Sequence, residues 1–255
     1  MSSTPAPVVR TERAELTYAF CTALFVVVLV LTNVIGTKLF HLFEGGGPSF
    51  LFEGRPWVLT SGILTYPLTF LLTDLVAEIW GTRRARFMVL SGFGMSLLML
   101  GILQLAIALP AAPIWAQPEH GFADGASMQG AFAATFANPA ILAFASMLAY
   151  LVAQLFDVRL YHFWWKVTGG KHMWLRNNGS TWISQMVDTV IVNGIFLRFG
   201  LDMAWDDIRE VILAVYLCKV MLALVDTPLI YLGRAWMERF LGIPHDPERA
   251  SAPLA

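Results

Sequence analysis

The sequence contains few charged residues: Asp, Glu, Lys and Arg make up 14% of its 255 residues, whereas a soluble domain has about 25%. Hydrophobic residues make up 57%. The formal net charge is −1, so the chain has no excess of basic residues that would indicate a nucleic-acid partner. This composition excludes an ordinary soluble domain and indicates a protein that crosses a membrane several times.

Residues for redox, metal or hydrolytic chemistry are also scarce. The two cysteines, Cys21 and Cys218, lie in apolar runs, where we expect small buried side chains and not a disulfide or a metal site. The chain has no His-Glu-x-x-His, no Gly-x-Ser-x-Gly and no Gly-rich phosphate loop ending in Lys-Ser/Thr. We therefore expect no enzyme activity, no cofactor, no bound metal and no ATP hydrolysis by the chain itself.

What the sequence does contain is a series of long apolar runs. About 20 apolar residues in a helix cross the ~30 Å hydrocarbon core of a bilayer. We predict an all-α, polytopic membrane protein with six transmembrane helices. The predicted spans are residues 16–40, 58–80, 87–109, 139–164, 180–199 and 208–232.

The segments around these spans complete the predicted organisation. Residues 1–15 are an N-terminal segment, residues 16–240 the six-helix membrane domain, and residues 241–255 a flexible Pro- and Ala-rich tail. Residues 110–138 contain no Lys or Arg, and we expect a short interfacial helix there at residues 131–136.

Basic residues predict the orientation, because loops rich in Lys and Arg stay in the cytoplasm. They gather in the N-terminal segment, in the loop at residues 81–86, in the loop after the fourth span and in the C-terminal segment. Six alternating spans place these four segments on one side, so both termini are expected in the cytoplasm. The basic residues on that side are Arg10, Arg13, Arg83, Arg84, Arg86, Arg159, Lys166, Lys171, Arg176, Arg234, Arg239 and Arg249.

Polar residues inside the spans are the main functional signal. Asp74 and Glu78 lie one helical turn apart and therefore on one face of the second span. A carboxylate at membrane depth costs about 2.5–3.5 kcal/mol on insertion scales, so such groups pair or line a wet cavity. Glu78 equally suits the cytoplasmic interface, beside the arginines at residues 83–86.

Two of the charged residues are expected at the same depth in the membrane. At ~1.5 Å per residue, Asp188 and Lys219 both fall near the midplane and are a candidate ion pair. Asp226 shares a face with Lys219 but lies too far along the helix for direct contact. Asn193 suits helix packing and ligand contact equally, and small residues such as Gly92 and Gly94 suit close helix packing.

Several blocks of residues resemble one known family. They are Thr-Asp-Leu-Val-Ala-Glu at residues 73–78, Ala-Tyr-Leu-Val-Ala-Gln-Leu-Phe-Asp at residues 149–157, Thr32-Asn33, Asp188-Thr189 and Lys219-Val220. In this order they look like the queuosine precursor transporter family, also called the vitamin uptake transporter (VUT) family. The resemblance implies uptake of 7-cyano-7-deazaguanine and 7-aminomethyl-7-deazaguanine across the cell inner membrane. Residues 110–138 and the C-terminal tail have no counterpart in the resemblance.

The chemistry of such a substrate agrees with the polar residues. A deazaguanine presents an N–H and an amino group side by side, which a carboxylate accepts together, while an amide serves the carbonyl side. We expect Asp188 or Asp74 at the donor edge and an aromatic ring on the flat base. The expected substrate-binding residues are Asn33, Phe70, Asp74, Tyr150, Gln154, Gln185 and Asp188, with Trp182 as a further stacking candidate. The residues expected in ion pairing or proton coupling are Glu78, Lys219 and Asp226.

Three functions from different classes stay open at this stage. The first is a self-sufficient transporter that works by facilitated or proton-coupled transport. The second is a substrate-binding membrane subunit of a multi-component uptake system. The third, a membrane-embedded enzyme, is disfavoured by the missing motifs. The expected partners are the deazaguanine and the lipid bilayer, with no nucleic acid; a homodimer is left open.

Overall fold

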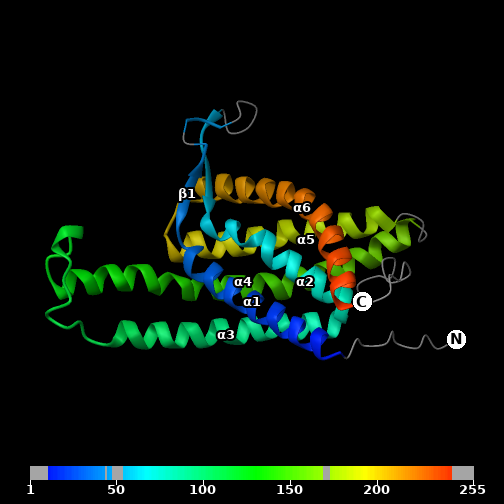
Figure 1. Cartoon of the computed structure of the whole chain (residues 1–255). Helices are drawn as coiled ribbons and strands as arrows, with labels where there is room; N and C mark the ends of the chain where they lie inside the picture. Colours follow the sequence, from blue (N-terminus) through cyan, green and yellow to red (C-terminus); the bar gives the residue numbers. More distant parts are fainter. Residues whose placement is uncertain (1–10, 44, 48–53, 169–172, 243–255) are drawn as a thin grey trace. The chain divides into compact units, whose positions relative to one another are not determined.

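The structure, a computed structural model, describes residues 11–43, 45–47, 54–168 and 173–242 (Figure 1). The described part of the chain is almost entirely helical, as predicted. Its long helices are α1 (Glu12–Ile35), α2 (Tyr66–Trp80), α3 (Thr82–Ala108), α4 (Gly125–Thr168), α5 (Met173–Ile195) and α6 (Trp205–Leu241). Strands β1 (Leu39–Leu42) and β2 (Trp57–Thr60) pair in an antiparallel hairpin. The short helices are η2 (Ser61–Leu64), η3 (Pro118–His120) and the π-helix η4 (Phe196–Gly200).

Three helical stretches within the described residues are long and apolar enough to cross a membrane: Glu12–Ile35, Arg83–Ala108 and Gly125–Tyr150. In α2, Tyr66–Ala77 is a shorter apolar helix. The structure therefore confirms an all-α protein with helices able to cross a membrane. The number of six spans and the cytoplasmic termini stay predictions.

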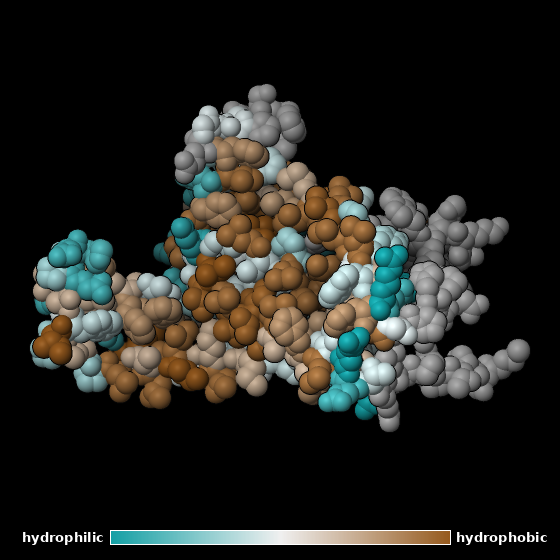
Figure 2. Space-filling model, in the orientation of Figure 1, coloured by the Kyte–Doolittle hydropathy of each residue, from teal (hydrophilic) through white to brown (hydrophobic). Residues whose placement is uncertain are grey.

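The surface of these helices is apolar, as lipid contact requires. On α1, Leu16 and Phe20 are exposed, whereas Cys21 and Phe25 on another face are buried. Figure 2 shows apolar side chains along much of the helical surface in that view. A helix that exposes its large apolar residues in this way is stable only in a non-aqueous surrounding.

The hairpin corrects the first two predicted spans. Helix α1 ends at Ile35, and β1 follows with Leu39 paired to Thr60 of β2. The hydroxyl of Ser61 donates to the carbonyl oxygens of Ile35 and Lys38, which ties the end of α1 to the hairpin. Spans 16–40 and 58–80 were wrong at these ends because the short apolar strands adjoin apolar helices, and hydropathy alone does not separate them.

The beginning of α4 corrects the prediction of a short interfacial helix between the third and fourth spans. Residues 131–136 are not a separate interfacial helix, because they belong to α4, which starts at Gly125 and continues through Pro139. Asp124 caps this helix: its Oδ1 accepts the N–H of Ser127 at 2.8 Å, and its own N–H donates to the Ser127 hydroxyl at 3.2 Å.

The turn between α2 and α3 is shorter than predicted. Gly81, with φ of +87°, ends α2, and its N–H donates to the carbonyl of Ala77. Helix α3 begins at Thr82, so the arginines expected in a loop lie in its first turns.

The chain forms two compact units. Unit 1 comprises Met1–Thr32, Leu64–Ser96 and Met221–Ala255, and unit 2 comprises Asn33–Ile63 and Leu97–Val220. In unit 1, glycines allow close helix contacts: a Cβ on Gly92 would lie 2.9 Å from the Phe25 ring, and one on Gly233 would lie 3.2 Å from Leu75. In unit 2, α4 and α5 pack side by side (Figure 1).

Candidate functional site

An ion pair lies inside unit 2, between α5 and α6. Lys219 Nζ donates to Asp188 Oδ2 at 2.8 Å, and the two side chains are 10% and 23% exposed. A charge in an apolar helix is tolerated when an opposite charge compensates it. The predicted pairing of these two residues is therefore present in the structure.

The carboxylate belongs to a polar stripe along α5. Gln185, Asp188 and Thr189 lie on neighbouring positions of one helical face, and Ser184 and Asn193 continue it in the two directions. Thr189 is fully buried and Asn193 nearly so. The Thr189 hydroxyl donates to the carbonyl of Gln185 at 2.7 Å, and Asn193 Nδ2 donates to the carbonyl of Thr189 at 2.9 Å.

Two residues of this stripe, Ser184 and Thr189, were missed as site candidates. The signal that could have found them is their spacing, because positions three and four residues from Gln185 and Asp188 share a helical face. We refer below to Ser184, Gln185, Asp188, Thr189 and Asn193 together as the α5 polar stripe.

An aromatic residue stands close to the stripe in sequence. Trp182 is half-exposed, and its backbone carbonyl accepts the hydroxyl of Tyr216 from α6 at 3.3 Å. This hydrogen bond and the Asp188–Lys219 pair both join α5 to α6, at positions six residues apart on α5 and three residues apart on α6.

Unit 1 holds the other predicted carboxylate, Asp74, which is half-buried on α2. The threonines along α2 mostly satisfy their hydroxyls locally: Thr69 donates to the carbonyl of Tyr66 and Thr73 to that of Phe70, both at 2.8 Å. Phe70 already contacts the ring of Tyr66, with centroids 4.2 Å apart. Asp74 and Phe70 are thus the groups of α2 with chemistry suited to a flat, hydrogen-bonding ligand.

Some of the predicted site residues lie in unit 1 and others in unit 2. Asn33, buried, and Tyr150, half-buried, lie in unit 2 together with Gln185, Asp188 and Lys219. Phe70 and Asp74 lie in unit 1. The side chains of Glu78, Gln154 and Asp226 fall outside the described residues. That all these side chains line one wet cavity stays a prediction.

Two open pockets lie elsewhere in unit 2. They have volumes of about 180 Å³ and 500 Å³ and adjoin the end of α3 and the beginning of α4. Trp115, Phe132 and Gln129 line the first, and Asp124 and Gln129 the second. Neither is lined by a predicted site residue, so the candidate site is defined by the α5 polar stripe and its ion pair.

Comparison with known proteins identifies the family. The family model described as "Putative vitamin uptake transporter" matches residues 60–233, more than half of the chain. The chain belongs to the vitamin uptake transporter family. This confirms the resemblance seen in the sequence, and the matched region includes Asp74, Asp188 and Lys219.

A curated relative agrees with this membership of the vitamin uptake transporter family. It is the "Probable queuosine precursor transporter" of Bacillus subtilis (strain 168), 28% identical over 194 residues, which cover 75% of this chain and 76% of the relative. No solved structure matches the chain. As a member of this family with several membrane-capable helices, the protein is a multi-pass membrane transporter and not an enzyme.

Proposed function

We propose that the protein imports queuosine precursors, 7-cyano-7-deazaguanine and 7-aminomethyl-7-deazaguanine, across the cell inner membrane. The family and the name of the Bacillus subtilis relative support the substrate class. The structural observation that carries the proposal is the α5 polar stripe, which holds a compensated carboxylate among buried hydroxyl and amide groups.

The carboxylate of Asp188 suits the donor edge of a deazaguanine. An ionised carboxylate has about four lone-pair sites on two oxygens, and the contact with Lys219 uses Oδ2. The N–H and amino groups of the substrate bind this carboxylate as a bidentate pair. Gln185 and Asn33 supply amides for the carbonyl side, and Trp182 or Tyr150 stacks on the ring.

In this proposal the chain has six spans with both termini in the cytoplasm. Unit 1 supports the assignment: the start of α1 contacts the start of α3 through Glu15–Arg84 and the end of α6 through Arg13–Phe240. These are segments that the basic residues assign to one side. Transport is facilitated or coupled to protons, with Glu78 or Asp226 as the proton carrier.

Uptake of labelled precursor, in cells that cannot make it, tests the proposal. Asp188→Asn and Asp74→Asn should each reduce uptake at least about tenfold, because loss of one charged hydrogen-bonding partner costs about 1.5–3 kcal/mol. Asp206→Asn, at an exposed position in the first turn of α6, is the matched control and should transport normally. Normal uptake by both site variants, at equal expression, would refute the proposed substrate site.

A second measurement separates the transporter from a subunit that needs an energising module. The purified chain, reconstituted in liposomes without ATP, should accumulate or equilibrate labelled precursor by itself. Binding of precursor without any transport would instead favour the multi-component uptake system.

A further inference from the structure

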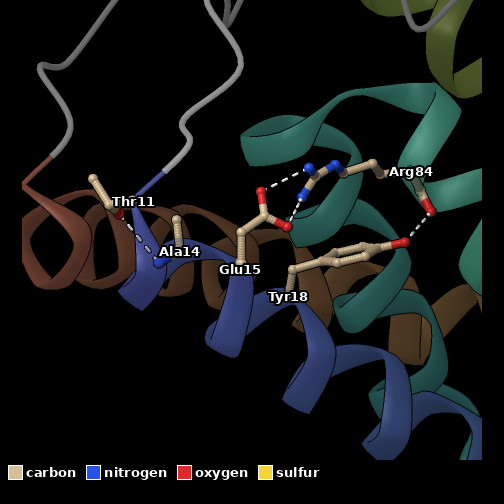
Figure 3. A network of polar contacts seen from close by, with 5 residues as sticks. All are labelled: Thr11, Ala14, Glu15, Tyr18 and Arg84. Carbon is tan, nitrogen blue, oxygen red and sulfur yellow. Dashed lines mark hydrogen bonds and ion pairs between the residues drawn. The ribbon is translucent and has the colours of Figure 1, made fainter.

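One end of unit 1 gathers segments that lie far apart in the sequence. Glu15 of α1 holds Arg84 of α3 by two contacts, of 2.7 Å and 2.9 Å, as Figure 3 shows. The Arg84 guanidinium lies 4.9 Å from the centre of the Tyr18 ring, and the Tyr18 hydroxyl donates to the Arg84 carbonyl at 3.1 Å. The start of α1 is therefore fixed to the start of α3.

The end of α6 joins the same place. Arg13, beside Glu15 on α1, donates to the carbonyl of Phe240 at 3.2 Å, and its guanidinium lies 5.0 Å from the centre of the Phe240 ring. Phe240 in turn stacks on Trp236, with ring centres 5.3 Å apart. Three helix ends thus form one surface.

The arginines of this surface differ in how they are compensated. Arg84 is neutralised by Glu15, and Arg234 by Glu238 at 2.8 Å. Arg83, Arg86 and Arg239, by contrast, are exposed, and none of them forms an ion pair within the described part of the chain. They flank Arg84 and Phe240, so they add a surplus of positive charge to this end of unit 1.

Exposed aromatic rings lie among these arginines. Phe87 and Trp236 are each 62% exposed. Aromatic side chains of this kind prefer the level at which lipid headgroups meet the hydrocarbon core. Guanidinium groups donate in a fork geometry that matches the oxygens of a phosphate. The surface therefore offers apolar rings to acyl chains and cations to phosphates in the same place.

We propose that this basic–aromatic surface, formed by Arg13, Arg83, Arg86, Phe87, Trp236, Arg239 and Phe240, binds the headgroups of anionic phospholipids. Clusters of basic residues next to a membrane helix are attracted by an anionic leaflet. The bound phosphates bridge the ends of α1, α3 and α6 and add to the Glu15–Arg84 and Arg13–Phe240 contacts. The anionic lipid is a binding partner distinct from the transported substrate.

The experiment compares the purified full chain in nanodiscs of phosphatidylcholine alone and of phosphatidylcholine mixed with phosphatidylglycerol. Phosphatidylglycerol should raise the thermal unfolding midpoint of the wild type by a few degrees, because a ligand that binds the folded state stabilises it. The triple variant Arg83→Gln/Arg86→Gln/Arg239→Gln should lose more than half of this rise. High salt should weaken the wild-type effect, since it screens exposed charges.

The matched control is Arg209→Gln, an exposed arginine at the other end of α6 that pairs with Asp206. It should keep the full rise. An equal rise in wild type and triple variant, or an equal loss in Arg209→Gln, would overturn the proposal. If the triple variant does not fold, native mass spectrometry of the three single variants decides: each should retain fewer phosphatidylglycerol molecules than wild type, and unchanged retention in all three contradicts the proposal.

Discussion

The charges of Asp188 and Lys219 are stabilised by each other more than by solvent. Each would be an uncompensated charge among apolar helices without the other. The same pairing also fixes the position of the carboxylate that we propose binds the ligand. Stability and the proposed binding role therefore depend on the same two side chains.

Mutation can separate the contribution of this ion pair to stability from its contribution to substrate binding. Lys219→Met should destabilise the protein by up to about 3 kcal/mol, because it leaves Asp188 partly buried without its partner. Adding Asp188→Asn should restore most of the stability but not the uptake of precursor. Thermal unfolding and uptake assays on the single and double variants provide the test. A double variant that transports like wild type would show that Asp188 does not contact the substrate.

The Glu15–Arg84 pair should behave differently, because its side chains are 46% and 26% exposed. Exposed ion pairs contribute about 0–1 kcal/mol. Glu15→Gln should therefore lower the free energy of unfolding by less than about 1 kcal/mol, and the exchange Glu15→Arg/Arg84→Glu should recover part of the loss. Thermal unfolding at low and high salt measures both effects; a loss unaffected by salt would argue against an electrostatic contribution.

At the scale of elements, close packing in unit 1 depends on small residues. A Cβ on Gly92 of α3 would lie 2.8 Å from the Leu29 side chain and 2.9 Å from the Phe25 ring, both on α1. Gly92→Ala should destabilise the protein by about 1–3 kcal/mol through overpacking. Gly94→Ala is the matched control, because no atom lies within 4 Å of its added Cβ. Equal unfolding midpoints for the two variants would contradict this packing.

The N-terminal cap of α4 makes that element sensitive to acid. The hydrogen bond from the Ser127 backbone N–H, followed by that from its hydroxyl, holds the pKa of Asp124 below its ordinary value. A lowered pKa means that the cap is complete at neutral pH and is lost as the carboxyl becomes protonated in strong acid. Protection of the backbone amides at the start of α4, measured as hydrogen exchange relative to the intrinsic rate at each pH, should therefore fall below the ordinary carboxyl pKa. Asp124→Ala should show low protection at every pH; a pH response unchanged by this substitution would exclude the cap as its source.

At the scale of the whole molecule, the proposed topology makes a direct prediction. A reporter fused after residue 242 should be cytoplasmic, and one inserted at Gly121, in a part of the chain without Lys or Arg, should lie on the opposite side. Enzymatic reporters that are active on only one side of the membrane provide the measurement. Three predicted spans, an odd number, separate the two positions. Reporters that both lie on the same side would contradict this number and indicate an even number of spans.

Much of the architecture was predictable because the hydropathy of a segment depends only on the residues of that segment. Apolar runs indicated the helices, and the blocks around Asp74 and Gln154 indicated the family. The β1–β2 hairpin and the early start of α4 were not predicted, since both are decided by local hydrogen bonds at Ser61 and Asp124 that a hydropathy average does not contain.

The sequence by itself determined that the protein belongs in a membrane, that it is helical and which family it joins, because these depend on residue type and order. Only the tertiary structure decided which groups meet. The sequence offered Asp188–Lys219 only as a candidate pair, and it did not indicate that Arg84 contacts Glu15 or that Arg13 contacts Phe240. Such pairings depend on how each helix is rotated and where it ends, which packing of the neighbouring helices sets and composition does not.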